Sequence, residues 1–212
     1  GVQTCALPIS KLIDANFAGT QKSKQCTLIH CEGDSAKAGI VSGLTKEDRN
    51  VIGVYPMKGK IFNTRGETLK KINDNKEIIE MKQILGLEAG KVYNDDNIGT
   101  LRYGSVLFMT DQDLDGSHIK GLGLNLFQDQ WNSLATHPKF LGFMNTPILK
   151  AKKTSSPNKG AEKVFYNEGE YLTWKESNPS GWDIKYYKGL GTSTGKEFKE
   201  YFANKKDRKS TR

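Results

Sequence analysis

Three short apolar runs alternate with segments of helical periodicity along this chain. The runs occupy residues 26–31 (CTLIHC), 50–57 (NVIGVYPM) and 105–109 (SVLFM), and each is apolar on both faces. Strands that are buried on both faces are typical of parallel sheets. A helix is expected from Ser35 onward, after the first run. The alternation predicts an α/β fold, with a mostly parallel sheet flanked by helices.

Two further helices are expected on the same grounds. One spans 69–86, where apolar residues recur at roughly helical spacing: Ile72, Ile79, Met81, Ile84 and Leu85. The other follows the third strand, where a comparable set suits a helix that covers a sheet: Ile119, Leu122, Leu126 and Phe127.

The residue composition and the apolar pattern of the chain change near Pro147. Short extended runs then flank a stretch rich in Lys, Ser, Pro and Gly, of which residues 154–160 form the expected loose turn. We predict a β-hairpin or a smaller α+β extension that joins the first domain at its C-terminal end.

The amino-acid composition limits the classes of protein to which this chain can belong. Hydrophobic residues make up 36% and charged residues 26% of the 212, and no apolar run approaches the roughly 18 residues of a membrane helix. We therefore expect no membrane association. Lysine and arginine number 32 against 24 acidic residues, a net charge of +8. This excess favours an acidic partner such as nucleic acid.

Both ends of the chain match the translation of a common sequencing adapter. Residues 1–9 (GVQTCALPI) correspond to one strand of that adapter, and residues 207–212 (DRKSTR) correspond to the other. Our hypothesis is that neither tail belongs to the natural protein, and sequencing the genomic locus tests it. Without the tails the chain keeps its basic excess.

Two cysteines remain once the first tail, which holds Cys5, is set aside. Cys26 and Cys31 are five positions apart, so on a strand their side chains point to opposite faces. They would make a poor zinc site with His30, and we expect buried thiols rather than a disulfide framework.

Four carboxylates carry the candidate chemistry. Glu32 follows the first predicted strand, and Asp111, Asp113 and Asp115 follow the third. Ligands of open parallel sheets bind at this carboxyl edge. Acids so close together in a half-buried site repel one another unless a cation is present. Oxygen ligands favour Mg²⁺, with Mn²⁺ as the alternative, over zinc.

Two other interpretations of the acidic run stay open from the spacing alone. The three aspartates followed by Gly116 are similar to the start of a calcium-binding EF-hand loop, but Leu122 stands where the closing glutamate belongs. The run could also be a solvated acidic turn without a function.

Basic and amide residues beside these acids suit a phosphate backbone. Lys58, Lys60 and Asn63 follow the second predicted strand, and Lys188 begins a glycine-rich turn (KGLGTS). Lysine supplies charge to phosphate, and glycine lets a backbone approach closely. Such turns are also commonly only solvated or capped helix starts.

Five motifs in this order make the chain resemble the type IIA DNA topoisomerases, and more closely the eukaryotic and large-virus enzymes than the bacterial gyrase subunit. They are EGDSA at 32–36, PMKGKIFN at 56–63, TDQDLDGSHIKGL at 110–122, TPI at 146–148 and YYKGLGTSTGKEFKEYF at 186–202. The resemblance covers most of residues 11–206.

The resemblance implies a TOPRIM domain, with its Rossmann-like sheet, over residues 25–143. Residues 10–24 would be a linker from an upstream transducer region, and 144–206 an extension that leads into the DNA-cleavage core. In that family the matching acids hold Mg²⁺, which assigns the metal to Glu32, Asp111, Asp113 and Asp115. Lys60 and Asn63 are expected to contact DNA, with Lys58 beside them. The family has Leu-Arg where this chain has Met57-Lys58, so a bidentate phosphate contact becomes a point-charge contact.

The resemblance also implies an activity: ATP-dependent passage of one DNA duplex through another. A tyrosine attacks the phosphodiester, and Glu32 would relay the proton of the 3′ oxygen. The nucleophilic tyrosine and the ATP site are expected outside residues 10–206, so this piece alone should be inactive. The implied partners are double-stranded DNA and a second copy in a homodimer. The location would be the nucleus, or the host cytoplasm or virion for a large DNA virus.

A free-standing TOPRIM nuclease or primase is the alternative function. Such an enzyme would share the glutamate and the aspartates, but not the motifs at 56–63 and 185–194.

Overall fold

The structure is a computed structural model that describes residues 8–57, 68–110, 114–187 and 197. Within four of the described helices and strands, the side chains of 69, 110, 114–120, 122 and 145 are not described.

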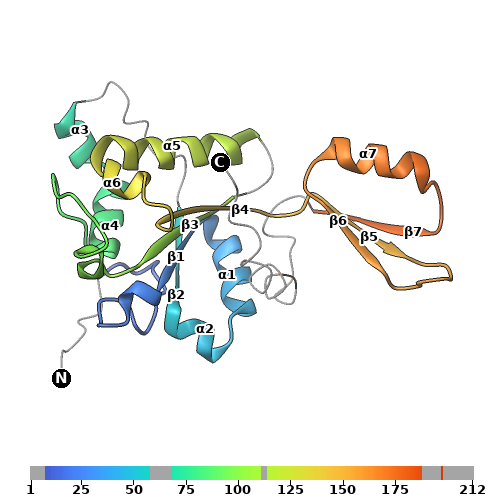
Figure 1. Cartoon of the computed structure of the whole chain (residues 1–212), viewed down its shortest axis with the longest axis horizontal. Coiled ribbons are helices and arrows are strands. Elements are labelled where there is room, and N and C mark those ends of the chain that lie inside the picture. Colours follow the sequence, from blue (N-terminus) through green and yellow to red (C-terminus); the bar gives the residue numbers. More distant parts are fainter. Residues whose placement is uncertain (1–7, 58–67, 111–113, 188–196, 198–212) are drawn as a thin grey trace.

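A four-stranded parallel sheet forms the centre of the larger region (Figure 1). Its strands are β1 (Thr27–Glu32), β2 (Ile52–Met57), β3 (Ser105–Thr110) and β4 (Leu141–Asn145), in the spatial order β2-β1-β3-β4. The predicted α/β class is confirmed. Asn50 and Val51, expected in the second strand, instead end helix α2. Strand β4 was not predicted, because its five residues at the sheet edge are mostly half-buried and show no clear alternation.

Helices cover both faces of this sheet. Helices α1 (Gly33–Gly43) and α2 (Lys46–Val51) lie on one side, and α1 buries Ala36 and Ile40 against Ile29 and Cys31. On the other side lie α4 (Lys76–Leu85), α5 (Leu114–Gln130) and the short α6 (Asn132–Ala135), as Figure 1 shows. Two 3₁₀ turns, Ser23–Gln25 and Ile98–Thr100, precede β1 and β3. Coverage on both faces explains why the strands are apolar throughout.

The helix predicted over 69–86 is two helices. Helix α3 (Leu69–Asn73) stops at Asp74, and α4 starts after Asn75, whose side chain accepts a hydrogen bond from the Ile78 amide at 3.3 Å. The break changes the phase of the apolar positions. Ile78 is therefore buried, whereas Ile79, which the spacing placed in the core, is 39% exposed. Asparagine is a favoured N-cap residue, so Asn75 is a local signal for a helix start that the apolar periodicity does not contain.

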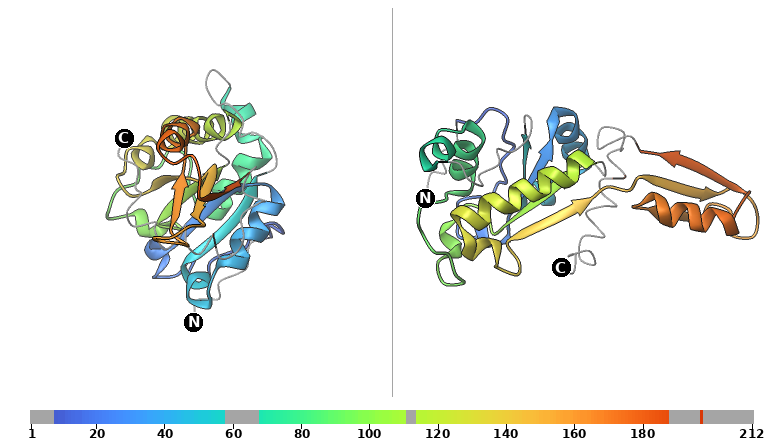
Figure 2. Two further views of the ribbon diagram at one scale, coloured as in Figure 1. Left: turned by 90° about the vertical axis from the view of Figure 1, so that its right-hand side faces the viewer. Right: turned by 90° about the horizontal axis from the view of Figure 1, so that it is seen from above.

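A second, antiparallel sheet follows the parallel one. It contains β5 (Leu149–Lys153), β6 (Glu162–Phe165) and β7 (Trp182–Tyr186) in the order β6-β5-β7. Helix α7 (Glu168–Ser177) packs on one face, where its Tyr171 joins Leu149, Ala151 and Phe165 of the sheet in one buried cluster. Figures 1 and 2 show this α+β unit projecting from one end of the larger region. The predicted hairpin with its turn at 154–160 is confirmed.

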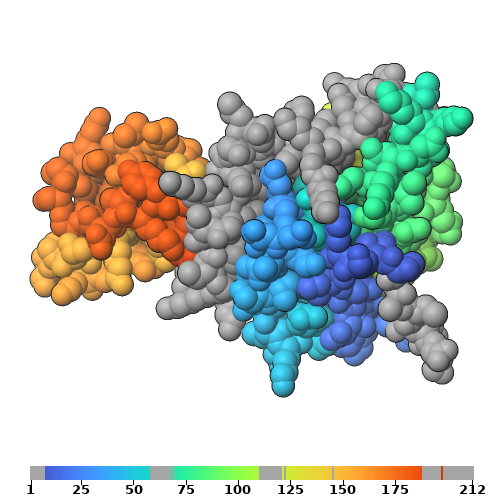
Figure 3. Space-filling model, turned by 180° about the vertical axis from the view of Figure 1, so that it is seen from behind, coloured from blue at the N-terminus to red at the C-terminus, as the bar shows by residue number. Residues whose placement is uncertain are grey.

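Residues 9–18 pack against the larger region. Ile9, Ala15 and Ala18 are buried, and Ile13 forms a backbone bridge with Val54 of β2. Figure 3 shows this blue segment continuous with the surface of α1 and α2. The domain boundaries given above stay predictions.

A polar cluster holds this segment in place. The Asp14 carboxylate accepts hydrogen bonds from Arg102 and from the Tyr103 hydroxyl, and that hydroxyl also accepts from the Ala15 amide at 2.9 Å. Burial, and next the Asp14 bond, raise the pKa of Tyr103, so the hydroxyl stays protonated.

Both cysteines are buried thiols on opposite sides of the sheet, as predicted. Cys26 packs with the α4 and α5 side, and Cys31 packs with α1. Burial raises the pKa of Cys26 to about 11 and that of Cys31 to about 12. Neither thiol is a nucleophile at neutral pH. None of the helices in the described ranges has the length and apolar character needed to cross a bilayer.

Candidate metal centre

The four parallel strands end at one level. Glu32, the last residue of β1, is paired with Met57, the last residue of β2. On the other side of β1, Cys31 is paired with Met109, which brings Glu32 beside Thr110 at the end of β3. Thr110 is in turn paired with Asn145, the last residue of β4. All the strand ends therefore meet at the carboxyl edge, where ligands of parallel sheets bind.

The predicted acids leave from neighbouring strands at this edge. Asp111 follows Thr110 directly, so its backbone continues from the strand next to Glu32. Asp111 and Asp113 lie outside the described residues. Asp115 lies in the first turn of α5, where only the backbone is described. The topology thus brings together two positions, 32 and 110, that are far apart in the sequence.

The predicted DNA contacts leave from the same edge on the other side of Glu32. Lys58 follows Met57 of β2, but Lys58, Lys60 and Asn63 lie outside the described residues. Lys188 follows Tyr187 of the second sheet and also lies outside them. The assignments of these residues stay predictions.

Glu32 occupies the junction between strand and helix. It precedes α1 with an extended backbone, and its side chain does not cap the helix. Gly33, the first residue of α1, has a φ of 83°, which L side chains rarely adopt, so glycine is needed here for the turn. The turn directs the chain into α1, whose N-terminus favours negative charge. Glu32 itself is half-buried.

The core directly below Glu32 contains a buried histidine. His30 is 1% exposed and stacks on Tyr55, with ring centroids 5.3 Å apart, and it meets Phe108 edge-on at 5.4 Å. Among the described residues neither ring nitrogen has a hydrogen-bond partner. Burial lowers the pKa of His30 to about 3, so the ring is neutral at physiological pH. It therefore gives the acids no charge to pair with.

The donor set fits a hard divalent cation. Three aspartates and a glutamate offer only oxygen atoms, and the sheet brings their strand ends to one edge. Within the part of the chain that is described, no group of three or more His, Cys, Asp or Glu side chains could hold a metal. Asp111 and Asp113 lie outside that part, so the predicted metal set stays a prediction.

Comparison with known proteins assigns the fold. Residues 27–145 match the Toprim domain, and residues 144–211 match the C-terminal associated domain of TOPRIM. The chain belongs to the Toprim family. This Toprim chain is similar to DNA topoisomerase 2 of Plasmodium falciparum (50% identity over 95% of the chain and 14% of the relative) and of Arabidopsis thaliana (49% identity over 96% and 14%). DNA topoisomerase 2-alpha of Rattus norvegicus is 51% identical over 93% of the chain and 13% of the relative.

A solved structure agrees with these relatives. The crystal structure of the Plasmodium falciparum topoisomerase II DNA-binding, cleavage and re-ligation domain matches with a TM-score of 0.85 and 48% identity, over 97% of this chain and 27% of that one. The resemblance inferred from the five motifs is confirmed. The Toprim chain spans about one seventh of the length of the curated relatives it matches.

Sequence reasoning missed two features around this centre. Strand β4 supplies a fourth end to the edge, and the apolar run Leu141–Met144 was its only signal. His30 was considered only as a zinc ligand, whereas the structure buries it between two aromatic rings. A sequence gives no sign that a histidine will lack a partner.

Proposed function

We propose that this chain is the Mg²⁺-holding part of an ATP-dependent type II DNA topoisomerase. The observation that carries the proposal is the adjacency of β1 and β3, which brings Glu32 to the strand end from which Asp111, Asp113 and Asp115 follow. The similarity to DNA topoisomerase 2 over nearly the whole chain supports it. The match of residues 144–211 to the C-terminal associated domain favours it over a free-standing nuclease or primase.

Glu32 and the three aspartates would hold the cation at the carboxyl edge. When bound, the ion would offset negative charge on the 3′ oxygen that leaves the phosphodiester. Glu32, half-buried at the end of β1, would accept the proton of the 3′ hydroxyl when that hydroxyl attacks during religation. Lys58, Lys60, Asn63 and Lys188 would hold the DNA backbone. The tyrosine nucleophile, the ATP site and the dimer contacts of the full-length protein are proposed to lie in other parts of it.

Thermal unfolding tests the metal site. Wild type, Glu32→Gln and Asp113→Ala are compared with and without millimolar Mg²⁺, and Asp96→Asn is the control because Asp96 is exposed and follows neither β1 nor β3. Wild type and Asp96→Asn should gain stability from Mg²⁺, whereas the other two variants should gain less. Removing a like charge should also leave Asp113→Ala at least as stable as wild type without metal. Equal gains in all four proteins would refute the shared site.

Salt-dependent DNA binding tests the basic residues. Each single replacement of Lys58, Lys60 or Lys188 by alanine should lower the dependence of DNA affinity on salt concentration, the salt slope, by about one counterion. The sequence preference should change little. An unchanged slope would assign that lysine to the solvated surface. The isolated chain should neither cleave nor relax DNA, and a covalent protein–DNA adduct formed by it would contradict the location proposed for the nucleophile.

A further inference from the structure

A groove lies between strand β6 and helix α7 of the extension. Residues 163–165 of β6 line one side, and Glu170, Thr173, Trp174 and Ser177 of α7 line the other. Its volume of about 560 Å³ is in the range of ligand sites in proteins. Both elements belong to the antiparallel unit, so this groove is separate from the carboxyl edge of the parallel sheet.

Strand β6 is the outer strand of its sheet, in the order β6-β5-β7. Odd-numbered residues of β5 bond toward β6, as Lys153 does when its amide donates to the Ala161 carbonyl at 2.8 Å. By this alternation residues 163 and 165 bond to β5, whereas the backbone of Val164 faces away from it. Among the described strands, β6 therefore has an open edge to which a further strand can add.

An aromatic side chain lines the groove beside this edge. Trp174 is half-buried, so part of its ring is open to the groove. Its ring lies 5.0 Å from that of Phe165 and meets Trp182 edge-on at 4.9 Å, both measured between centroids. These contacts hold the ring in place. A fixed aromatic ring of this kind is a typical contact for an apolar side chain of a partner.

A lysine without a carboxylate partner lies beside the aromatic rings. Lys163 Nζ is 5.5 Å from the centroid of Phe165 and 5.9 Å from that of Trp174. Lys163 is exposed, and among the described residues it forms no ion pair. An ammonium group at this place complements an acidic side chain of a partner.

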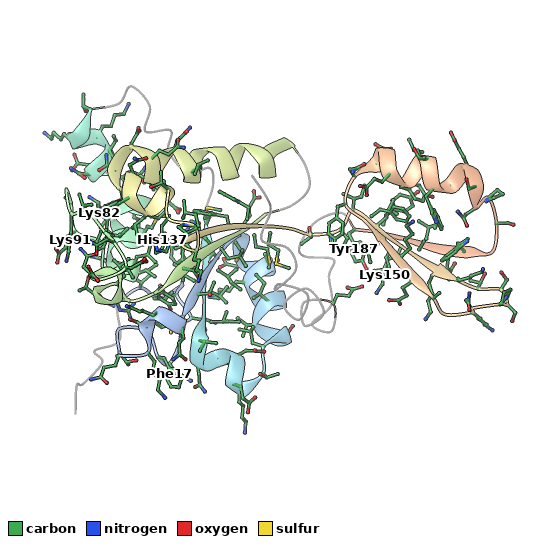
Figure 4. The ribbon with its side chains drawn as sticks, viewed as in Figure 1. Phe17, Lys82, Lys91, His137, Lys150 and Tyr187 are labelled. Atoms are coloured by element: carbon green, nitrogen blue, oxygen red, sulfur yellow. The ribbon has the colours of Figure 1, made fainter. Side chains whose placement is uncertain are left out.

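The opposite face of the sheet differs in this respect. Figure 4 labels Lys150 on the side of the sheet away from α7. Lys150 is paired with Glu162 at 2.6 Å, and Lys185, which lies directly opposite Lys150 on β7, is paired with Glu197 at 3.0 Å. These two lysines already have carboxylate partners within the chain, so the groove side is the better place for an acidic ligand.

The charge of α7 favours a polypeptide over nucleic acid. The helix carries Glu168, Glu170 and Glu176 against Lys175, and Glu170 lines the groove. Carboxylates along the groove repel a phosphate backbone, which binds where basic residues are in excess. An open strand edge, by contrast, offers hydrogen bonds that a peptide backbone satisfies.

We propose that this groove binds an extended segment of a partner protein, which adds to β6 as a further strand. The segment places an apolar side chain on Trp174 and pairs an acidic side chain with Lys163. In binding of this mode the main chain supplies affinity and alternate side chains supply specificity. The inference does not depend on the metal site or on the DNA contacts proposed above.

The charge at Lys163 is tested with two synthetic peptides of about nine residues, in which threonine alternates with apolar residues. One peptide has an aspartate at the central apolar position, and the other has a lysine there. By fluorescence polarisation, the full chain should bind the aspartate peptide at least about tenfold more tightly, and Lys163→Glu should invert this preference.

Lys159→Glu is the matched control for this charge reversal, because Lys159 is an exposed lysine of the same unit that does not line the groove. It should keep the wild-type preference. Binding of neither peptide, or a preference that Lys163→Glu leaves unchanged, would overturn the proposal.

Hydrogen exchange tests the addition of a strand. At a peptide concentration of about ten times its dissociation constant, the Val164 amide should exchange about tenfold more slowly. The Lys163 amide, which faces β5, should change little. Val164→Pro removes only the outward amide, so it should lose binding and keep the near-ultraviolet circular dichroism of Trp174 and Trp182.

Two results would contradict strand addition. One is unchanged exchange of the Val164 amide in the wild-type complex, and the other is full peptide binding by Val164→Pro with its circular dichroism intact. If Val164→Pro loses that signal, the wild-type exchange decides alone.

A DNA duplex is the competing occupant. It should not displace the aspartate peptide from wild type, because its phosphates would meet the glutamates of α7. Displacement by the duplex would assign the groove to nucleic acid, and the peptide proposal would fail. The metal response of Glu32→Gln is measured without peptide, so failure of the proposed function and failure of this inference are distinguishable.

Discussion

The two sheets of this chain differ in strand pairing and in how many of their faces are covered. The parallel sheet is covered on both faces, so its strands are apolar throughout and their polar residues gather where the strands end. Among the described residues, α7 covers one face of the antiparallel sheet, and the other face carries Lys150 and Lys185 with their glutamate partners. A parallel sheet therefore concentrates charge at an edge, whereas a half-covered antiparallel sheet displays it across a face.

The cores differ in size as well as in pairing. The larger region has aliphatic and aromatic clusters on both sides of its sheet, whereas the described part of the extension has one small hydrophobic cluster of buried residues, namely Leu149, Ala151, Phe165 and Tyr171. Trp174 and Trp182 are half-buried there and complete the small core by ring contacts, with centroids 4.9 Å apart. A core of this size is expected to unfold before the larger one.

Truncating one central ring in each region should give the largest effect. Phe108 of β3 is fully buried between helix and sheet, so Phe108→Ala should cost about 3–5 kcal/mol and unfold the larger region first. Phe165→Ala should instead melt the extension and leave the larger region intact. The reporters are Trp131 in the larger region and the tryptophan pair in the extension, followed by fluorescence and near-ultraviolet circular dichroism during urea unfolding. Loss of both signals together in Phe165→Ala would show that the two regions are one cooperative unit.

The next effect in size comes from the close approach of the β2 backbone to the Tyr103 side chain in the larger region. A β-carbon at Gly53 of β2 would overlap the Tyr103 hydroxyl, which is held by Asp14 and Ala15. Gly53→Ala should therefore cost about 1–3 kcal/mol through overpacking. Gly121→Ala in α5 is the matched control, because no described atom other than its chain neighbours and its own helix backbone lies within 4 Å of the added β-carbon, and it should stabilise by about 0.5–1 kcal/mol. Urea midpoints measure both, and a neutral Gly53→Ala would mean that Tyr103 can move.

Acid should weaken the larger region through His30. The folded pKa of about 3 lies below the unfolded value of 6.5, so the unfolded state binds the proton first. The contribution of neutral His30 to the free energy of unfolding is fully present above pH 6.5. It is lost progressively as the pH drops toward 3, and the loss is about 2 kcal/mol at pH 5.

The variant His30→Leu isolates this contribution, because it removes the titrating group and keeps a similar volume. The difference in unfolding free energy between it and wild type should depend on pH between 3 and 6.5 and be constant above. The measurement is made with a chelator so that no metal takes part. A difference independent of pH would mean that protonated His30 finds a partner in the folded state.

Helix caps should give the smallest effects and compare the two regions directly. Thr45 caps α2 by accepting from the Asp48 amide at 3.1 Å, and Asn167 caps α7 by accepting from the Glu170 amide at 2.8 Å. Each change to alanine should cost about 1 kcal/mol. The same loss should lower the melting temperature of the extension visibly and that of the larger region little. Equal shifts would contradict the difference in core size.

The sequence by itself determined the fold class, and it predicted the acids at the sheet edge. Apolar runs at 26–31, 50–57 and 105–109 specified the strands, because burial on both faces favours apolar side chains. The five motifs identified the resemblance, which the comparisons confirm. Boundaries were less certain where local capping overrode periodicity, as at Asn75.

Only the tertiary structure decided which strands are neighbours and which polar groups share a surface. The strand order brings residue 32 beside residue 110, and no local pattern encodes that pairing. The same holds for His30, whose neighbours Tyr55 and Phe108 come from two other strands. It holds too for Glu197, whose partners are Lys185 of β7 and Tyr187, the residue after that strand. Sequence patterns show which face of each segment is buried and which is exposed to water. Which segments pair depends on contacts between distant residues, and these contacts form only in the folded chain.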